Sequence, residues 1–381
     1  MTRDDIARRR LRNERLVGAP FASAVEVVGW LGAVQAQDYA GAKWAIGQRV
    51  RGATDASVET AFDRGDILRT HVLRPTWHAV LPADIRWLLA LTAPQVKARM
   101  AYYDRQLQLD DRTYARTNAV VARALEGGHH LTRDELGKTL AAAGIACSGQ
   151  RLGHVMMRAE LDAVVCSGAR RGKQFTYALL AERAPHVAPL ARDEALAALV
   201  RRYFTSHGPA QLIDFAWWSG LTVAHAKAGV EMLAGDLVHA DVDGKRYWLA
   251  PARLPAAARG PVLHLLPNYD EFLIAYKDHG PSVDRALVRG LGPTDAVFAN
   301  HLVVIDGVVV GGWRRIPEKR GMVVAPTLLR ALSAGEKAAL ARACETYGRF
   351  LALPVTLAPA RRAGAGVPSA PSTGRARARA R

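Results

Sequence analysis

The chain has 381 residues, of which half are hydrophobic and 23% are charged, an ordinary composition for a globular protein that buries substantial cores. This length is long for one core and predicts two or three domains of about 100 to 200 residues each. The net charge of +17 is unusual. Residues 361–381 hold six arginines and no acid, so the first 360 residues keep a charge of +11. This excess favours a polyanionic partner, with nucleic acid first and an anionic membrane or simple solubility as alternatives.

The cysteines and the hydropathy exclude several classes of protein. Cys147, Cys166 and Cys344 form neither a close pair nor a metal-ligand spacing, so we expect a reduced protein without structural zinc. No apolar stretch approaches the ~20 residues of a membrane span, and no apolar segment follows the N-terminus. We therefore expect a cytoplasmic, nucleoid-associated protein that needs no metal, no cofactor and no membrane.

The first 110 residues fit one winged helix, with predicted helices at 5–15, 22–34 and 57–64 and a hairpin at 68–81. Gln35-Ala36-Gln37-Asp38 follows the second helix directly. Two glutamines at this spacing reach one site only on an extended backbone, because side chains along a strand alternate between faces. Their amides offer neutral carbonyl acceptors and N–H donors. Asp38 then points away from them. A pair of loop glutamines is also common as plain solvated surface.

A second unit follows in residues 111–190, with predicted helices at 118–125, from 132 and at 148–161, and two strands within 164–179. Thr132 is expected to cap its helix, since Glu135 stands three residues later at the spacing of a capping box. Arg170, Arg171 and Lys173 make the predicted wing tip basic.

A third unit is predicted in residues 191–258, with helices at 195–204, 211–218 and 224–233 and a hairpin at 237–249. Thr222 is a typical cap for the last helix, and Asp243-Gly244 favours a two-residue hairpin turn. One such pattern is weak evidence for a winged helix, but three in series on a basic chain are much less expected by chance. A protein-protein module is the alternative for each.

The remaining residues, 259–358, are predicted to form mainly β-strands instead of helices. Strands are predicted at 262–267, 296–305 and 308–316, with a hairpin at Asp306-Gly307 and a closing helix over 328–350 that begins near Ser333. The sequence thus predicts an α+β protein of three tandem winged helices and a mainly β C-terminal domain. Residues 359–381 are expected to be a disordered, arginine-rich tail.

Three segments resemble the AlkZ-like winged-helix DNA glycosylases. They are residues 35–47 (QAQDYAGAKWAIG), 69–78 (RTHVLRPTWH) and 266–274 (LPNYDEFLI). The resemblance runs from about residue 5 to 358, and its most specific mark is the Gln-x-Gln motif of Gln35 and Gln37. A related branch has Asp in place of the second glutamine, so this chain is similar to the Gln-x-Gln branch.

The resemblance implies a C-shaped clamp on double-stranded DNA that excises alkylated purines and, in some members, unhooks interstrand crosslinks. An N7-alkylguanine or N3-alkyladenine is already cationic and leaves as a neutral base. The enzyme must therefore supply a placed water and a favourable setting for an oxocarbenium-like sugar. Gln35 and Gln37 are the expected catalytic residues. Asp38 is the second candidate, as a base that activates water, and otherwise a structural acceptor.

Further residues are expected to contact DNA, and each has a structural alternative as a solvated or packed side chain. Lys43 follows the motif and is expected to meet a phosphate. The same is expected of basic residues in the first hairpin, in the second wing and in the strand at 308–316. These are Arg69, His71, Arg74, Arg170, Arg171, Lys173, Arg314 and Arg315. Residues 268–271 either line the DNA cleft or form a buried junction between domains. Trp77, Trp217 and Trp218 are expected to pack.

Two other functions compete with a monofunctional glycosylase. A non-catalytic winged-helix regulator would read bases with the two glutamines, as glutamine does with adenine. A protein-protein scaffold would bind its partner without the steep salt dependence of phosphate contacts. We expect a monomer, because three tandem modules have no evident need of a partner subunit.

Overall fold

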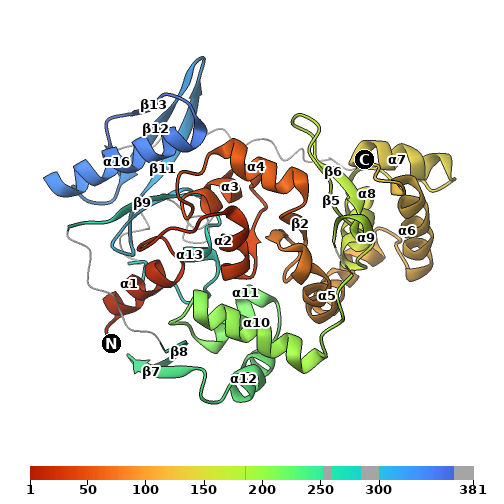
Figure 1. The fold of residues 1–381 in the computed structure, drawn as a ribbon, viewed down its shortest axis with the longest axis horizontal. Coiled ribbons are helices and arrows are strands. Elements are labelled where there is room, and N and C mark those ends of the chain that lie inside the picture. The colour runs from red at the N-terminus through yellow and green to blue at the C-terminus, as the bar shows by residue number, and fades with distance from the viewer. Residues whose placement is uncertain (185, 252–259, 285–299, 364–381) are drawn as a thin grey trace, which may run out of the picture.

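The computed structural model describes residues 1–184, 186–251, 260–284 and 300–363. It is a mixed α+β fold in which three helical units, each with a small sheet, accompany a larger curled sheet formed by the C-terminal residues (Figure 1). Within these ranges no helix is long and apolar enough to cross a bilayer.

The first unit holds the glutamine motif. Its elements are α1 (Arg3–Asn13), α2 (Ala24–Leu31), β1 (Val34–Gln35), α3 (Tyr39–Gly47), α4 (Asp55–Arg64), β2 (Leu68–His71) and β3 (Trp77–Val80). The three strands form an antiparallel sheet in the order β1-β3-β2. The predicted helix over 22–34 was too long: α2 stops at Leu31 because Gly32 takes a φ of 81°, and Val34 already belongs to β1. The helix α3 was not predicted.

The long helix α5 (Pro82–Gln106) leads to the second unit, whose strands have the sheet order β4-β6-β5. The elements are α6 (Asp111–Leu125), β4 (Leu131–Thr132), α7 (Arg133–Ala142), α8 (Gly149–Leu161), β5 (Val165–Ser167), β6 (Thr176–Leu179) and α9 (Leu180–Arg183). The predicted capping box of Thr132 and Glu135 is confirmed, because each side chain accepts from the other residue's backbone N–H.

The third unit comprises α10 (Arg192–Ser206), α11 (Leu212–Ser219), α12 (Val223–Met232), β7 (Val238–Val242) and β8 (Lys245–Leu249). Thr222 caps α12 as predicted, by accepting the His225 N–H at 3.2 Å. The turn between β7 and β8 is also confirmed, since Asp243 and Gly244 both have positive φ, at 50° and 73°.

The C-terminal residues form a sheet in the order β13-β12-β11-β10-β9, and β14 also pairs with β12. The elements are β9 (Leu263–Leu266), α13 (Glu271–Ile274), β10 (Leu302–Ile305), β11 (Val308–Glu318), β12 (Gly321–Leu328), α16 (Ala334–Leu351), β13 (Val355–Leu357) and β14 (Arg361–Arg362). Ser333 caps α16 as predicted. The strand β12 was missed, and residues 296–299 of the predicted strand at 296–305 lie outside the described residues.

The start of the expected disordered tail is ordered. Arg361 and Arg362 pair with Thr327 and Leu328 of β12, which places them on the sheet. Residues 364–381, with the other four arginines, lie outside the described residues.

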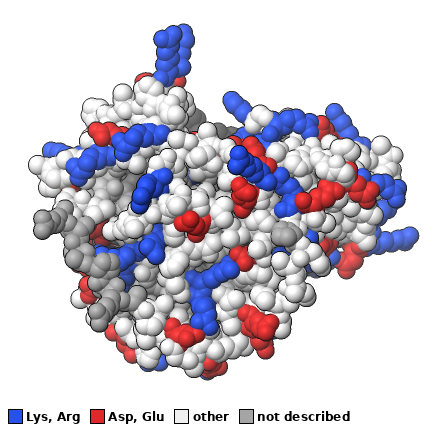
Figure 2. Space-filling model, viewed as in Figure 1, with Lys and Arg blue, Asp and Glu red and all other residues white. Residues whose placement is uncertain are grey.

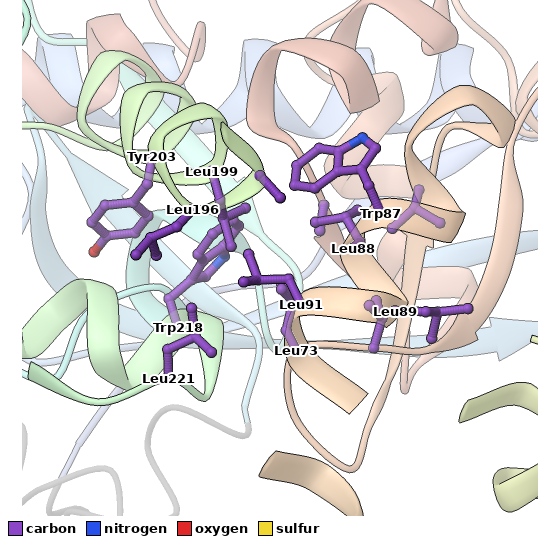
Figure 3. Packing of buried hydrophobic residues seen from close by; sticks show 14 of the residues in the cluster. Leu73, Trp87, Leu88, Leu89, Leu91, Leu196, Leu199, Tyr203, Trp218 and Leu221 are labelled. Carbon is purple, nitrogen blue, oxygen red and sulfur yellow. The ribbon is translucent and has the colours of Figure 1, made fainter. Parts of the chain in front are cut away.

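Two hydrophobic cores join the first unit to other parts of the protein. One contains Leu73 of the β2–β3 hairpin together with α5 and the helices of the third unit, and Figure 3 shows Leu73 near Leu91, Trp218 and Leu221. The other joins α2, α3 and α4 to the C-terminal sheet, where the Trp44 indole donates to the Leu265 carbonyl at 2.7 Å. The glutamine motif therefore sits on a strand that is fixed from two sides.

Candidate active site

The two glutamines lie where β1 ends and α3 begins. Gln35 pairs with His78 of β3, and the Ala36 N–H donates to the Trp77 carbonyl at 2.7 Å, so the backbone is extended through Ala36. The Gln35 side chain is buried, at 6% exposure, whereas Gln37 is exposed. The Oε1 atom of Gln35 lies 3.4 Å from the Gln37 backbone nitrogen, so it is turned along the chain towards Gln37. One amide is thus fixed inside the protein and the other faces solvent.

Asp38 is held at the start of α3. Its Oδ1 accepts the Gly41 N–H at 3.1 Å, which makes it the N-cap of the helix. Its Oδ2 lies 3.4 Å from a guanidinium nitrogen of Arg315. Both carboxylate oxygens therefore have structural partners, as expected of the alternative in which Asp38 is a structural acceptor.

The buried carboxylate of Glu271 supports the strand that carries Gln35. Its Oε1 accepts the Gln35 backbone N–H at 2.7 Å, and its Oε2 accepts the Trp218 indole N–H at 2.9 Å. The Nε2 atom of His207 lies 3.5 Å from the same Oε2. Glu271 thereby ties the motif to α11 of the third unit. Sequence reasoning marked the segment 268–271 but missed this role, for which two adjacent acids in an apolar run were the available signal.

Asp270 completes a buried junction rather than a DNA-lining surface. The guanidinium of Arg49 donates to both Asp270 carboxylate oxygens, at 2.8 and 3.0 Å, and to Glu14 at 3.1 Å. All three side chains are at most 1% exposed. Burial raises the pKa of Glu14 to about 8, although the charge of Arg49 opposes the shift. Of the two alternatives for residues 268–271, Asp270 and Glu271 follow the buried one.

Arg69 contacts the motif itself and not an outer surface. Its Nε donates to the Ala36 carbonyl at 3.0 Å, and its guanidinium carbon lies 4.2 Å from the ring centre of Trp77 and 4.5 Å from that of Phe175. The side chain is 7% exposed, and this burial lowers the pKa of Arg69 to about 10. Arg69 therefore holds the residue between the two glutamines, and its contact with a phosphate stays a prediction.

Three other predicted DNA contacts are also engaged within the protein. Lys43 is 4% exposed, and its ammonium donates to Asp55 at 2.7 Å and to Glu59 at 2.6 Å. Arg170 pairs with Glu59 at 3.2 Å. His71 is buried against Glu160. Nearby carboxylates already engage these side chains, and their contact with DNA stays a prediction.

The remaining predicted contacts lie at the surface to different degrees. Lys173 and Arg314 are exposed, while Arg171 is exposed but paired with Glu135 at 2.7 Å. Arg315 is half-buried beside Asp38, and Arg74 lies at the tip of the β2–β3 hairpin. Figure 2 shows Lys and Arg side chains at the tip of the β11–β12 hairpin, over α16 and over the second unit, with acids between them.

The donor chemistry of this region is that of amides, carboxylates and guanidinium groups. Among the described residues, no group of three or more His, Cys, Asp or Glu side chains is placed to hold a metal ion. The packed tryptophans follow the prediction in part: Trp218 is fully buried, but Trp217 is 38% exposed. Trp77 is half-buried between Arg69 and His71.

Comparisons with known proteins agree with this architecture. Residues 28–350 match the family model described as DNA glycosylase AlkZ-like. A curated relative, the interstrand DNA cross-link repair glycosylase of Streptomyces sahachiroi, is 27% identical over 336 residues, which cover 83% of this chain and 88% of the relative. The solved structure of the Streptomyces sahachiroi DNA glycosylase AlkZ superposes with a TM-score of 0.79 at 24% identity, over 95% of this chain and 99% of that one. The family match spans most of the chain, and we conclude that the protein belongs to the AlkZ-like family of DNA glycosylases, which hydrolyse N-glycosidic bonds.

Proposed function

We propose that this chain is a monofunctional DNA glycosylase that excises cationic alkylated purines, N7-alkylguanine and N3-alkyladenine, by attack of water at the anomeric carbon. The observation that carries the proposal is the placement of Gln35 and Gln37 on an extended segment, with one amide fixed and one exposed. Family membership supplies the reaction class, and this geometry supports the proposed roles of the two glutamines.

The chemistry asks little of the protein beyond positioning. The bond between the anomeric carbon and the base nitrogen breaks with its electron pair on the base, which becomes neutral because it began as a cation. The water oxygen bonds to the anomeric carbon and its proton passes to solvent, since an amide is not a base. In the proposal, the carbonyls of Gln35 and Gln37 hold this water and face the developing positive charge of the sugar.

The surroundings favour water as the nucleophile over an amine. Lys43, the first lysine after the motif, donates its ammonium N–H groups to the carboxylates of Asp55 and Glu59, so its nitrogen is already engaged. A Schiff-base mechanism needs a free amine instead. Asp38 remains a secondary candidate as a base, but its role as helix cap and its contact with Arg315 favour a structural role.

We further propose three tandem winged helices arranged as a clamp on duplex DNA, in residues 1–110, 111–190 and 191–258, followed by a β-rich domain in residues 259–358. In the first two units the order helix, strand, helix, helix, hairpin supports this division. The third has a bridge between Ala210 and Trp248 in place of the first strand. Of the predicted DNA contacts, the exposed Lys173 and Arg314 fit best, with Arg171 and Arg315 beside them.

Interstrand crosslinks are proposed as a second class of substrate. The support is the name of the curated relative, an interstrand DNA cross-link repair glycosylase, at 27% identity. A base tied to the opposite strand cannot swing fully out of the duplex, so the site must act on a base that stays near the helix.

The test is release of 7-methylguanine and 3-methyladenine from a methylated duplex, run beside unhooking of a duplex crosslinked through N7 of guanine on both strands. We expect base release from both substrates without added metal. The competing hypothesis of a non-catalytic regulator predicts no base release, together with tight binding to one undamaged sequence. That combination of results would replace the glycosylase proposal.

A further inference from the structure

A group of positive side chains surrounds the exposed indole of Trp217, where the β2–β3 hairpin of the first unit meets α11. The guanidinium carbon of Arg74 lies 5.4 Å from the centre of the Trp217 ring, and the Lys277 ammonium lies 4.7 Å from it. Arg99 of α5 donates from Nη2 to the Gly220 carbonyl at 2.8 Å, just beyond the end of α11. Four segments that are distant in the sequence thus bring three cations to one place.

Within the described ranges, Arg74, Arg99 and Lys277 form no ion pair, and the Nε and Nη2 atoms of Arg74 are buried without a hydrogen-bond partner. Burial lowers the pKa of Arg74; the negative charge of Glu271 opposes this shift, and the charge of Arg99 adds to it. By contrast, the exposed Arg246 is paired with Asp241. An unpaired, partly buried guanidinium is costly unless an anion completes the site.

The geometry of this place is fixed by packing. Leu73, next to Arg74, is fully buried in the core that the hairpin shares with the third unit (Figure 3). Its carbonyl lies so close to Gly220 that a Cβ at that position would be 1.9 Å from the oxygen. The Trp217 indole N–H donates to the Ile274 carbonyl at 2.9 Å. The hairpin tip and the indole are therefore positioned before any ligand binds.

The cluster is close to the glutamine motif along the hairpin. Gln35 pairs with His78 of β3, and Arg74 lies four residues before His78. Four residues span at most about 13 Å at ~3.3 Å each. The step across the paired strands to Gln35 adds about 5 Å. A DNA strand advances about 3.4 Å per nucleotide, so the cluster lies within roughly five nucleotides of a base held at the motif.

We propose that Arg74 and Lys277 beside Trp217, together with Arg99 next to Gly220, form a binding site for a backbone phosphodiester of the DNA that flanks the lesion. A guanidinium fork matches two phosphate oxygens, and an ammonium adds a point charge. Such contacts carry no sequence information but fix the register of the duplex on the protein. That the neighbouring base is a lesion rests on the proposed function, whereas the phosphate contact does not.

The test is the salt dependence of binding to an undamaged duplex, measured by fluorescence anisotropy with the full chain. The variants are Arg99→Gln, Lys277→Gln and the double variant, which change exposed side chains and leave the half-buried Arg74 in place. Each lost phosphate contact lowers the slope of log affinity against log salt by roughly 0.9. Because the proposed site neutralises one phosphate, we expect that decrease in the double variant and a smaller decrease in each single variant.

Two matched controls remove an exposed cation that already has an acidic partner. Lys227→Gln acts on a lysine paired with Glu231 at 3.8 Å, and Arg246→Gln on an arginine paired with Asp241 at 3.1 Å. Both should keep the wild-type slope. A double variant of Arg99 and Lys277 with the slope of the controls would overturn the proposal, as would wild-type binding that does not weaken with salt.

This outcome is separable from that of the proposed function. If the wild type releases no alkylated base but the variants lose slope, the phosphate site stands and the glycosylase substrate is wrong. If the wild type releases base while the variants keep the full slope, the enzyme assignment stands and this site is rejected.

Discussion

Replacing Glu271 by glutamine should lower the free energy of unfolding, because one buried hydrogen bond to the side chain is lost. The carboxylate accepts two N–H groups, from the Gln35 backbone at 2.7 Å and the Trp218 indole at 2.9 Å, and it is 1% exposed. Glutamine offers one carbonyl oxygen and one NH2 group, so one of these buried donors loses its acceptor. A buried donor without a partner costs about 1–3 kcal/mol. We expect the free energy of unfolding of Glu271→Gln to fall by that amount.

Glu182→Gln is the matched control, because Glu182 also accepts two backbone N–H groups, from Gly127 and Gly128, but at an exposed position. Water replaces its bonds, so its effect should stay within about 0.5 kcal/mol. Urea unfolding followed by circular dichroism measures both variants. If Glu271→Gln is as stable as Glu182→Gln, the reasoning that Glu271 anchors the β1 strand fails.

Three further predictions concern the junctions and the response to pH. Gly220→Ala should lower stability by several kcal/mol and loosen the hairpin, because the new methyl group meets the Leu73 carbonyl; a thermal midpoint near that of the wild type would contradict this. Arg49→Met should cost about 3–5 kcal/mol, since Asp270 is left as a buried unpaired charge, and urea unfolding measures the loss. Burial, with the charge of a nearby arginine adding to it, lowers the pKa of His78 to about 3. The unfolded chain therefore binds a proton that the folded chain excludes between about pH 3 and pH 6.5, so stability should fall as the pH drops below 6.5, and His78→Gln should flatten the unfolding free energy measured from pH 5 to pH 7.

Local signals in the sequence were sufficient for much of the fold. The caps at Thr132, Thr222 and Ser333 and the turn at Asp243-Gly244 were predictable because each depends on residues within three or four positions. The helix α3 was not predictable in this way. Almost all of its residues are buried, so it lacks the polar face that reveals a surface helix.

Of the candidate site, only the glutamine motif could be recognised in the sequence, because its residues are neighbours in the chain. Gln35 and Gln37 were proposed from their spacing and the family resemblance. The partners of the predicted cations were not found, because no local sequence pattern links them to those cations. Lys43 meets Glu59, and Arg69 is covered by Phe175, which is 106 positions away in the sequence. Such pairing depends on tertiary packing, which a single sequence does not encode in any local pattern.

The most direct test of the account is single-turnover release of 7-methylguanine by wild type, Gln35→Ala and Gln37→Ala, with Gln106→Ala as a control. Gln106 is exposed at the end of α5, far along the chain from the motif. If the two amides position the attacking water, each motif variant should lose roughly 100-fold or more in rate, as when a positioning or charge-stabilising group is removed, while Gln106→Ala keeps the wild-type rate. Wild-type rates in both Gln35→Ala and Gln37→Ala would contradict the central claim.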